Sequence, residues 1–305
     1  MNLPSPLRGV VTAMITPLRD RDTLDVEGLN RLVDNLIDAR VNGLFILGTT
    51  GEAPSLSYKT RREVICETCQ HAAERIPVIV GITDTSFNES LALGRHAADC
   101  GAHGLVLAMP YYFATSQREL IGYVQRLVGE LPLPVFLYNA PSNTHHVLAL
   151  DTVRKLSELP KVSGIKDSGY DMIYFHKLVS TFRERPDFTL LVGPEELTAE
   201  AVLLGGHGGM CGGSNIEPKL FVDMYNAAVT RDLDTLKPLH SRIIQISSTV
   251  YRTTSEPSSY LRSLKCAVSL KGICRDTLAE PFEPLGPAER EQVRQAMVAS
   301  GLLES

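Results

Sequence analysis

A lysine stands at the end of an apolar, β-branched segment of the chain. The segment KVSGIK covers residues 161–166 and ends in Lys166. Burial favours the uncharged form of an amine, and an uncharged amine is a nucleophile that forms Schiff bases with ketones. The alternatives are a lysine that extends to the rim of the fold or one that pairs with Asp167.

Hydroxyl and phenol groups stand at the ends of other apolar segments. The loop GTTGE, residues 48–52, offers two hydroxyls and a run of backbone N–H groups, which is typical of a small anion cradle. Its alternative is a tight turn with a threonine capping the next helix. Tyr112 in PYY and Tyr138 in YNAP could relay protons if they are buried close together. Each could equally be a wall residue with its hydroxyl in water.

Taken together, these groups suit a 2-oxo acid such as pyruvate. The cradle would hold its carboxylate, the amine would attack its ketone, and the phenols would move protons during loss of water. The resulting imine is an electron sink, so a carbon–carbon bond next to the former carbonyl could break or form.

Eight apolar segments alternate with segments of helical period, as in an α/β protein. The predicted strands are 9–16, 43–47, 77–82, 103–108, 134–139, 161–166, 188–193 and 208–213. The predicted helices are 25–40, 57–74, 88–101, 116–130, 150–159, 171–184 and 194–206. Continuously apolar strands indicate a parallel sheet covered on both faces.

Eight such units predict a TIM (β/α)8 barrel, in which chemistry lies at the C-terminal ends of the strands. A doubly wound sheet is the alternative, but TPLRDRD follows the first strand instead of a glycine-rich fingerprint. We expect residues 1–215 to form the barrel and residues 216–305 to form a C-terminal helical extension packed on it.

Composition narrows the class of protein. The chain has 305 residues, of which 44% are hydrophobic and 21% charged, and a net charge of −5. This argues against nucleic-acid binding, and the apolar segments are too short for a membrane span. The start of the chain does not resemble a secretory signal. The six cysteines are scattered and too sparse for a disulfide scaffold. Cys66 and Cys69 are expected on one helix. Because this usage fits a reducing compartment, we expect a cytoplasmic protein.

The motifs GTTGE, PYY, YNAP and GIK resemble those of the dihydrodipicolinate synthase / N-acetylneuraminate lyase family of Schiff-base aldolases. The resemblance runs from about residue 8 to the C-terminus. It implies that Lys166 forms the Schiff base, that Tyr138 is the general acid/base, and that Thr49 links Tyr138 to Tyr112. Tyr112 is expected to reach into the active site of a neighbouring subunit of a homotetramer, a dimer of dimers.

The same resemblance implies residues that hold the substrate. Thr50 and the adjacent Gly51 of the cradle would bind the pyruvate carboxylate, and Gly193 and Met210 would line the pocket. The glycine-rich segment 204–213 is similar to the family's eighth strand. No metal or organic cofactor is implied.

One departure bears on the second substrate. Dihydrodipicolinate synthases read YNxPSRTG after the fifth strand, and this chain reads YNAPSNTH at residues 138–145. Asn143 replaces the arginine that would grip a carboxylate, and an amide cannot reproduce a bidentate guanidinium. His145 replaces the glycine. The neighbouring His146 could bind a different second substrate or could lie in solvent.

Three functions remain open from the sequence. The first is a Schiff-base lyase or aldolase acting on pyruvate or a related 2-oxo acid, with an aldehyde as partner. The second is dihydrodipicolinate synthase itself, which condenses pyruvate with aspartate semialdehyde. The third is a non-catalytic, ligand-binding barrel. A weaker likeness links Asn143-Thr144 and the segment 166–169 to 4-hydroxy-2-oxoglutarate aldolases.

Overall fold

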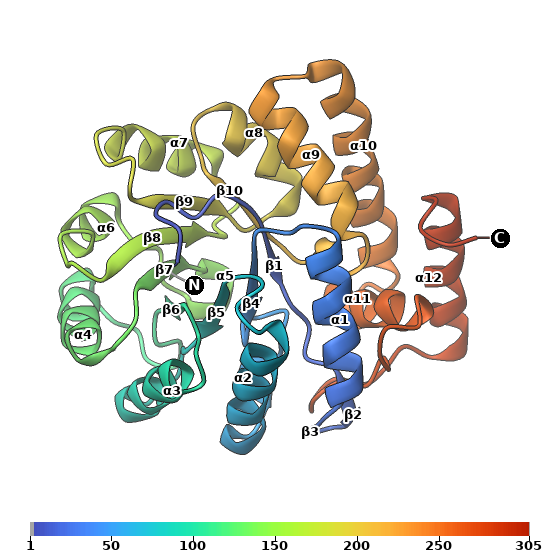
Figure 1. Ribbon diagram of the computed structural model, residues 1–305, viewed down its shortest axis with the longest axis horizontal. Helices are drawn as coiled ribbons and strands as arrows, with labels where there is room; N and C mark the ends of the chain where they lie inside the picture. The colour runs from blue at the N-terminus through green and yellow to red at the C-terminus, as the bar shows by residue number, and fades with distance from the viewer. Residues whose placement is uncertain (1–2, 305) are drawn as a thin grey trace.

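Eight parallel strands close into a barrel, as the sequence predicts (Figure 1). The computed structural model describes residues 3–304. The barrel strands are β1 (Gly9–Ala13), β4 (Gly43–Ile46), β5 (Val78–Gly81), β6 (Gly104–Ala108), β7 (Val135–Asn139), β8 (Val162–Asp167), β9 (Thr189–Val192) and β10 (Gly208–Cys211). Their order around the barrel is β1-β10-β9-β8-β7-β6-β5-β4, closed by pairing of β1 with β4.

An outer layer of helices covers the barrel. They are α1 (Val26–Asp38), α2 (Tyr58–Ala72), α3 (Phe87–Asp99), α4 (Gln117–Glu130), α6 (Leu150–Leu156), α7 (Met172–Thr181), α8 (Thr198–Leu203) and α9 (Pro218–Thr230). Several begin at side chains that cap the first turn: Ser57 accepts a hydrogen bond from the Thr60 N–H, and Ser116 with Glu119 forms a capping box. The predicted (β/α)8 architecture is confirmed.

Short elements that the sequence analysis did not predict interrupt the repeat. An antiparallel pair, β2 (Leu18–Asp20) and β3 (Thr23–Leu24), follows the first strand. A single helical turn, α5 (Pro141–Thr144), follows β7 and carries Asn143. Short 3₁₀ turns occur at η1 (Ala53–Ser55), η2 (Glu195–Leu197), η3 (Gly213–Asn215) and η4 (Val250–Arg252).

The core has two parts, as expected for strands with two buried faces. One lies between the strands and the outer helices. The other fills the barrel interior and includes Val11, Phe45, Phe136, Tyr138 and Met210. Successive residues of a strand point to opposite faces, so alternate residues of β7 and β8 point into this interior.

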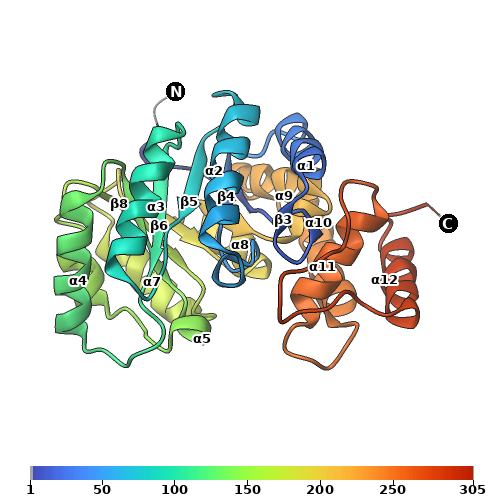
Figure 2. The same ribbon diagram turned by 90° about the horizontal axis from the view of Figure 1, so that it is seen from below.

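Three long helices extend the barrel at one side (Figure 2). They are α10 (Leu233–Thr249), α11 (Ser259–Leu270) and α12 (Pro287–Ala299). Because α9 packs on α8 and β1, it completes the outer ring before the extension begins. The division of the chain at residues 215 and 216 stays a prediction.

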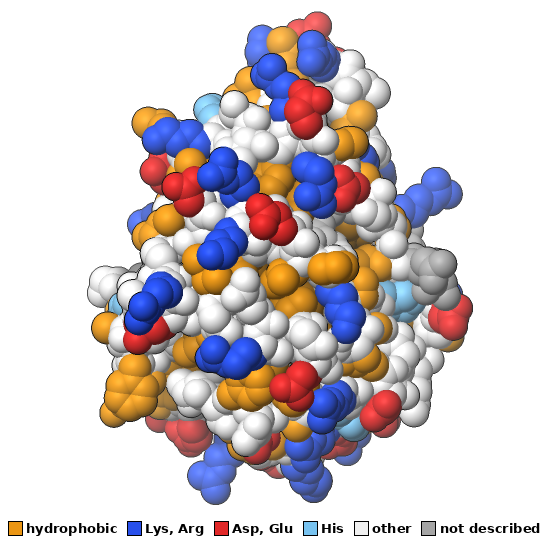
Figure 3. Space-filling view, turned by 90° about the vertical axis from the view of Figure 1, so that its left-hand side faces the viewer, with side chains coloured by type: hydrophobic (Ala, Val, Ile, Leu, Met, Phe, Trp, Pro, Cys, Tyr) orange, Lys and Arg blue, Asp and Glu red, His pale blue; other side chains and the backbone are white. Residues whose placement is uncertain are grey.

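The surface carries both signs of charge. Figure 3 shows one face on which basic and acidic side chains are interspersed with hydrophobic ones, so this face presents no single-sign field. Within residues 3–304, every helix is too short or too polar to cross a membrane.

The cysteines differ from the expectation in one respect. Cys66 and Cys69 both lie on α2, as predicted, but Cys66 forms a disulfide with Cys100 at the end of α3. Cys69 is free and buried. The disulfide ties two outer helices together, and scattered spacing in the sequence gave no sign of it because the two residues meet only in the folded barrel.

Candidate active site

Lys166 and Tyr138 are the central pair of the site. They are register partners on the neighbouring strands β8 and β7. Lys166 is only 5% exposed. Its Nζ atom lies 4.4 Å from the centroid of the Tyr138 ring and 4.9 Å from that of Phe45, both in cation–π range. The amine is thus held inside the barrel among aromatic rings.

The adjacent residues point the other way and form a separate pair. Asn139 Nδ2 donates to Asp167 Oδ1 at 2.7 Å, and the N–H of Gly169 donates to the same oxygen at 3.1 Å. Burial raises the pKa of Asp167, although these hydrogen bonds oppose it. Within residues 3–304 no ion pair joins Lys166 to a carboxylate. Neither alternative proposed for Lys166, extension to the rim or pairing with Asp167, describes this side chain.

The phenol of Tyr138 has several polar neighbours. Its hydroxyl accepts a hydrogen bond from Ser168 Oγ at 3.5 Å, and the side chains of Thr49 and Lys166 also lie near it. Burial acts to raise the pKa of Tyr138, but the positive charge of Lys166 and the polar groups of Ser168 and Thr49 outweigh it and hold the pKa below its ordinary value. A lowered pKa increases the fraction of Tyr138 that is ionised near neutral pH, and the phenolate is the form that accepts a proton.

Ser168 is a site residue that the sequence analysis did not single out. The available signal was the period of two along a strand, which places residue 168 on the same side as Lys166. Gly193 lies beside it: a Cβ atom at 193 would come within 1.9 Å of Ser168 Oγ. The predicted pocket residue Gly193 therefore leaves room for the Ser168 hydroxyl next to Tyr138.

Strained residues stand just before the GTTGE loop and at its end. Leu47 and Glu52 both have φ of 56°, a left-handed conformation that is costly for residues other than glycine. Between them, Thr49 is exposed and Thr50 is buried. The Gly51 N–H donates to the Gly48 carbonyl at 3.2 Å, so this amide is engaged within the loop.

The C-terminal extension contacts the GTTGE loop through Glu52. Glu52 forms an ion pair with Lys265 of α11, and both side chains are inaccessible to solvent. The second oxygen of Glu52 accepts a hydrogen bond from the Ala279 N–H at 2.8 Å. Burial lowers the pKa of Lys265, although Glu52 opposes this. A buried ion pair of this kind fixes the position of the loop.

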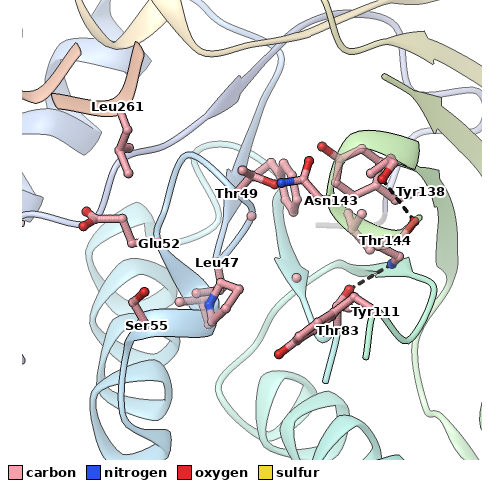
Figure 4. A pocket seen from close by; sticks show the side chains of 18 of the residues that line it. Leu47, Thr49, Glu52, Ser55, Thr83, Tyr111, Tyr138, Asn143, Thr144 and Leu261 are labelled. Atoms are coloured by element: carbon pink, nitrogen blue, oxygen red, sulfur yellow. Dashed lines mark hydrogen bonds between the residues drawn. The ribbon is translucent and has the colours of Figure 1, made fainter. Parts of the chain in front are cut away.

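A cavity of about 340 Å³ lies in front of these residues. Thr49, Tyr138 and Phe45 line it, and Leu261 contributes to its wall from the extension. Figure 4 shows Thr49 between Glu52 on one side and Asn143 with Tyr138 on the other. No lysine or arginine of the described residues lines the cavity; Lys166 itself lies against the rings of Tyr138 and Phe45, which do line it.

The residues of the segment after β7 lie in different environments. Asn143 lines the cavity, while His145 is exposed with φ of 60°. His146 is buried, and its Nε2 lies 3.2 Å from Thr115 Oγ1 and 3.3 Å from the Phe113 carbonyl oxygen. His146 therefore anchors the loop that follows β6, and the solvent-exposed alternative does not hold for it.

The remaining predicted residues lie in two places. Met210 is 1% exposed and belongs to the barrel interior with Tyr138 and Phe45. Tyr112 is 78% exposed and packs edge-on against Phe113, with ring centroids 5.0 Å apart. Its neighbour Tyr111 lines the cavity instead. One chain alone therefore brings together Lys166, Tyr138 and Thr49, but not Tyr112.

One group of potential metal ligands lies away from the cavity. Within residues 3–304, the only group of three or more potential ligands in mutual reach is Cys66, His96 and Cys100. The two sulfur atoms are bonded to each other, and none of the three residues lines the cavity.

A (β/α)8 barrel with a buried lysine beside a phenol at neighbouring strand ends defines an enzyme of the class I aldolase type, a lyase. The chain belongs to the dihydrodipicolinate synthetase family, whose model matches residues 6–300.

Similar proteins extend over the whole chain. It is 33% identical to the 4-hydroxy-tetrahydrodipicolinate synthase of Neisseria meningitidis serogroup C, covering 97% of this chain and 100% of that one. A dihydrodipicolinate synthase from Bacteroides thetaiotaomicron superimposes with a TM-score of 0.95 at 48% identity, covering 98% of this chain and 100% of that chain. A prophage protein of the same family from E. coli K12, solved in complex with pyruvate, gives 0.91 at 29% identity, with 97% and 99% covered.

Proposed function

We propose that this chain is a Schiff-base lyase or aldolase acting on pyruvate or a related 2-oxo acid. The observation that carries the proposal is the Lys166 amine, buried inside the barrel with no carboxylate partner among the described residues and 4.4 Å from the ring of Tyr138. The pyruvate complex of the E. coli relative supports the choice of 2-oxo acid.

The proposed reaction begins with attack of the unprotonated Lys166 amine on the ketone carbon. Tyr138 moves a proton from the nitrogen to the oxygen and then donates a second proton to the resulting hydroxyl, so that water leaves and a protonated imine remains. Loss of a proton from the neighbouring carbon gives an enamine, which adds to the aldehyde carbon. In the reverse direction the same iminium accepts the electron pair of the breaking bond. Because the iminium is the electron sink, the reaction requires no metal or organic cofactor.

The other site residues have proposed roles around this amine. Thr49, which lines the cavity beside Tyr138, passes protons from Tyr138 toward Tyr112 of a neighbouring subunit. Thr50 holds the carboxylate through its hydroxyl and its backbone, and Gly51 lies next to it in the cradle. The exposure of Tyr112 and Phe113 supports a homotetramer, in which these rings are covered. A cytoplasmic location stays the expectation from the sequence, although the Cys66–Cys100 disulfide is unusual for a reducing compartment.

A second candidate function is 4-hydroxy-tetrahydrodipicolinate synthase. The names of relatives at about 30% identity favour it. The cavity argues for a different aldehyde, because Asn143 lines it and no lysine or arginine of the described chain does. A carboxylate on the second substrate would lack the bidentate partner that arginine supplies.

The test is a substrate panel. Pyruvate is incubated with aspartate semialdehyde, with uncharged aldehydes or with sugar-derived aldehydes, and its consumption is followed. Turnover with an uncharged or sugar-derived aldehyde, lost in Lys166→Ala, supports the leading proposal. Turnover with aspartate semialdehyde alone establishes the synthase. Absence of turnover, with pyruvate binding retained in Lys166→Ala, indicates a non-catalytic barrel.

A further inference from the structure

The extension touches the GTTGE loop at a second point, next to the proposed carboxylate cradle. Tyr260 of α11 places its hydroxyl near the side chain of Thr50, since both oxygens lie close to Gly212. The backbone of Gly212 completes the contact: a Cβ atom at 212 would lie 1.8 Å from the Tyr260 hydroxyl and 3.7 Å from Thr50 Oγ1. Tyr260 is half-buried, and its hydroxyl lies close to the backbone of Gly212.

A second tyrosine fixes the ring of Tyr260. Tyr251 packs edge-on against it, with centroids 5.0 Å apart and planes at 88°. The Tyr251 hydroxyl donates to Glu195 Oε1 at 2.6 Å, and the Gly213 N–H donates to the other oxygen of Glu195 at 2.6 Å. The end of β10, the loop after β9 and the extension therefore support one phenol that points at the loop after β4.

The Thr50 hydroxyl has one proton, and the role of the Tyr260 phenol depends on where that proton points. A carboxylate only accepts hydrogen bonds, so a threonine hydroxyl that holds it must donate its single proton to it. That hydroxyl is oriented toward the ligand when another donor occupies its oxygen. Burial, together with the nearby charge of Glu195, raises the pKa of Tyr260 well above its ordinary value, so its O–H stays available as a donor.

We propose that Tyr260 is a positioning residue for the 2-oxo acid: its hydroxyl donates to Thr50 Oγ1 and directs the Thr50 O–H toward the substrate carboxylate. This inference rests on the proposed function, in which Thr50 holds that carboxylate. It gives the C-terminal extension a part in substrate binding, in addition to its ion pair with Glu52.

The experiment measures how much pyruvate is needed to trap the Schiff base with borohydride, a quantity that does not depend on the second substrate. Tyr260→Phe keeps the ring and removes only the hydroxyl. We expect the half-saturating pyruvate concentration to rise about 10-fold, because the hydrogen bond from the Thr50 hydroxyl to the charged carboxylate is weakened. The maximal yield of adduct on Lys166 should stay within about 2-fold of the parent chain.

Matched variants separate a positioning role from a general loss of packing. Tyr123→Phe removes a phenol of α4 that contacts Ser90 outside the cavity, and it should leave half-saturation unchanged. Thr50→Val should raise half-saturation by itself, and adding Tyr260→Phe to it should cause no further rise, because both act through one contact. Should Tyr260→Phe fold poorly by thermal unfolding, Gly212→Ala displaces the same phenol and should give the same rise.

The outcomes are distinct. Unchanged half-saturation in Tyr260→Phe, or an undiminished effect of this change in the Thr50→Val background, overturns the positioning role and leaves the proposed function in place. Absence of any adduct in the parent chain overturns the proposed function, and this inference with it.

Discussion

Tyr138 and Lys166 lie directly across from each other on adjacent parallel strands, with the amine 4.4 Å from the centre of the phenol ring. Both strands pair with neighbours on each side in the closed barrel, so neither side chain depends on a loop for its place. The charge of one lowers the pKa of the other, which couples their protonation.

Tyr138→Phe tests this coupling. The ring that packs on Lys166 and Phe45 remains, but the group that moves protons is lost, so kcat should fall about 10²- to 10⁴-fold. The Schiff base should still form, only more slowly, as borohydride trapping over time would show. A variant with kcat close to that of the parent would mean that another group transfers the proton.

Gly193→Ala should act through Ser168. The added Cβ atom would lie 1.9 Å from Ser168 Oγ, and the serine can turn away only by giving up its contact with Tyr138. We expect Gly193→Ala and Ser168→Ala each to lower kcat several-fold, with little additional loss in the double variant. Fully multiplicative losses would show that the two residues act independently.

Glu195 should make stability depend on pH. Burial raises its pKa from 4.5 to about 7, although hydrogen bonds from Tyr251 and the Gly213 N–H oppose the shift. The folded protein then holds a proton that the unfolded chain releases. The stabilisation is complete below pH 4.5 and is lost as the pH rises to 7, by about 3 kcal/mol.

Glu195→Gln provides the measurement, because glutamine resembles the protonated acid. Urea unfolding at pH 5 and pH 8 should show that the variant gains stability relative to the parent as the pH rises. The same difference at both pH values would contradict a raised pKa for Glu195.

Lys265→Met should destabilise the fold, because it leaves the Glu52 carboxylate buried without its partner. The expected loss in unfolding free energy is about 3 to 5 kcal/mol. Lys219→Met is the matched control, since Lys219 pairs with Asp223 at the surface and should contribute less than about 1 kcal/mol. Equal losses in the two variants would mean that the buried pair has no special role.

The barrel and the central pair could be predicted from the sequence because both depend on local periodicity. Apolar strands alternate with helical segments, and a residue at a strand end is assigned to the active face by the fold alone. That argument placed Lys166, Tyr138 and Thr49 together. Applied one step further, it would also have found Ser168.

The contacts between segments far apart in the sequence could not be predicted in this way. Tyr260 meets Thr50, and Lys265 meets Glu52, across more than 200 residues of sequence, and neither pair belongs to a local pattern. The same holds for Cys66 and Cys100, which lie on different outer helices. Tyr112 is exposed in the single chain, so its expected place in the site of a neighbouring subunit stays a prediction.

The most direct test of the central claim is to locate the covalent adduct. The protein is incubated with pyruvate, reduced with borohydride, digested, and its peptides are analysed by mass spectrometry. We predict one reduced pyruvate adduct, on Lys166, absent without pyruvate and absent in Lys166→Ala. An adduct on another lysine, or none at saturating pyruvate, would contradict the assignment of Lys166 as the Schiff-base residue.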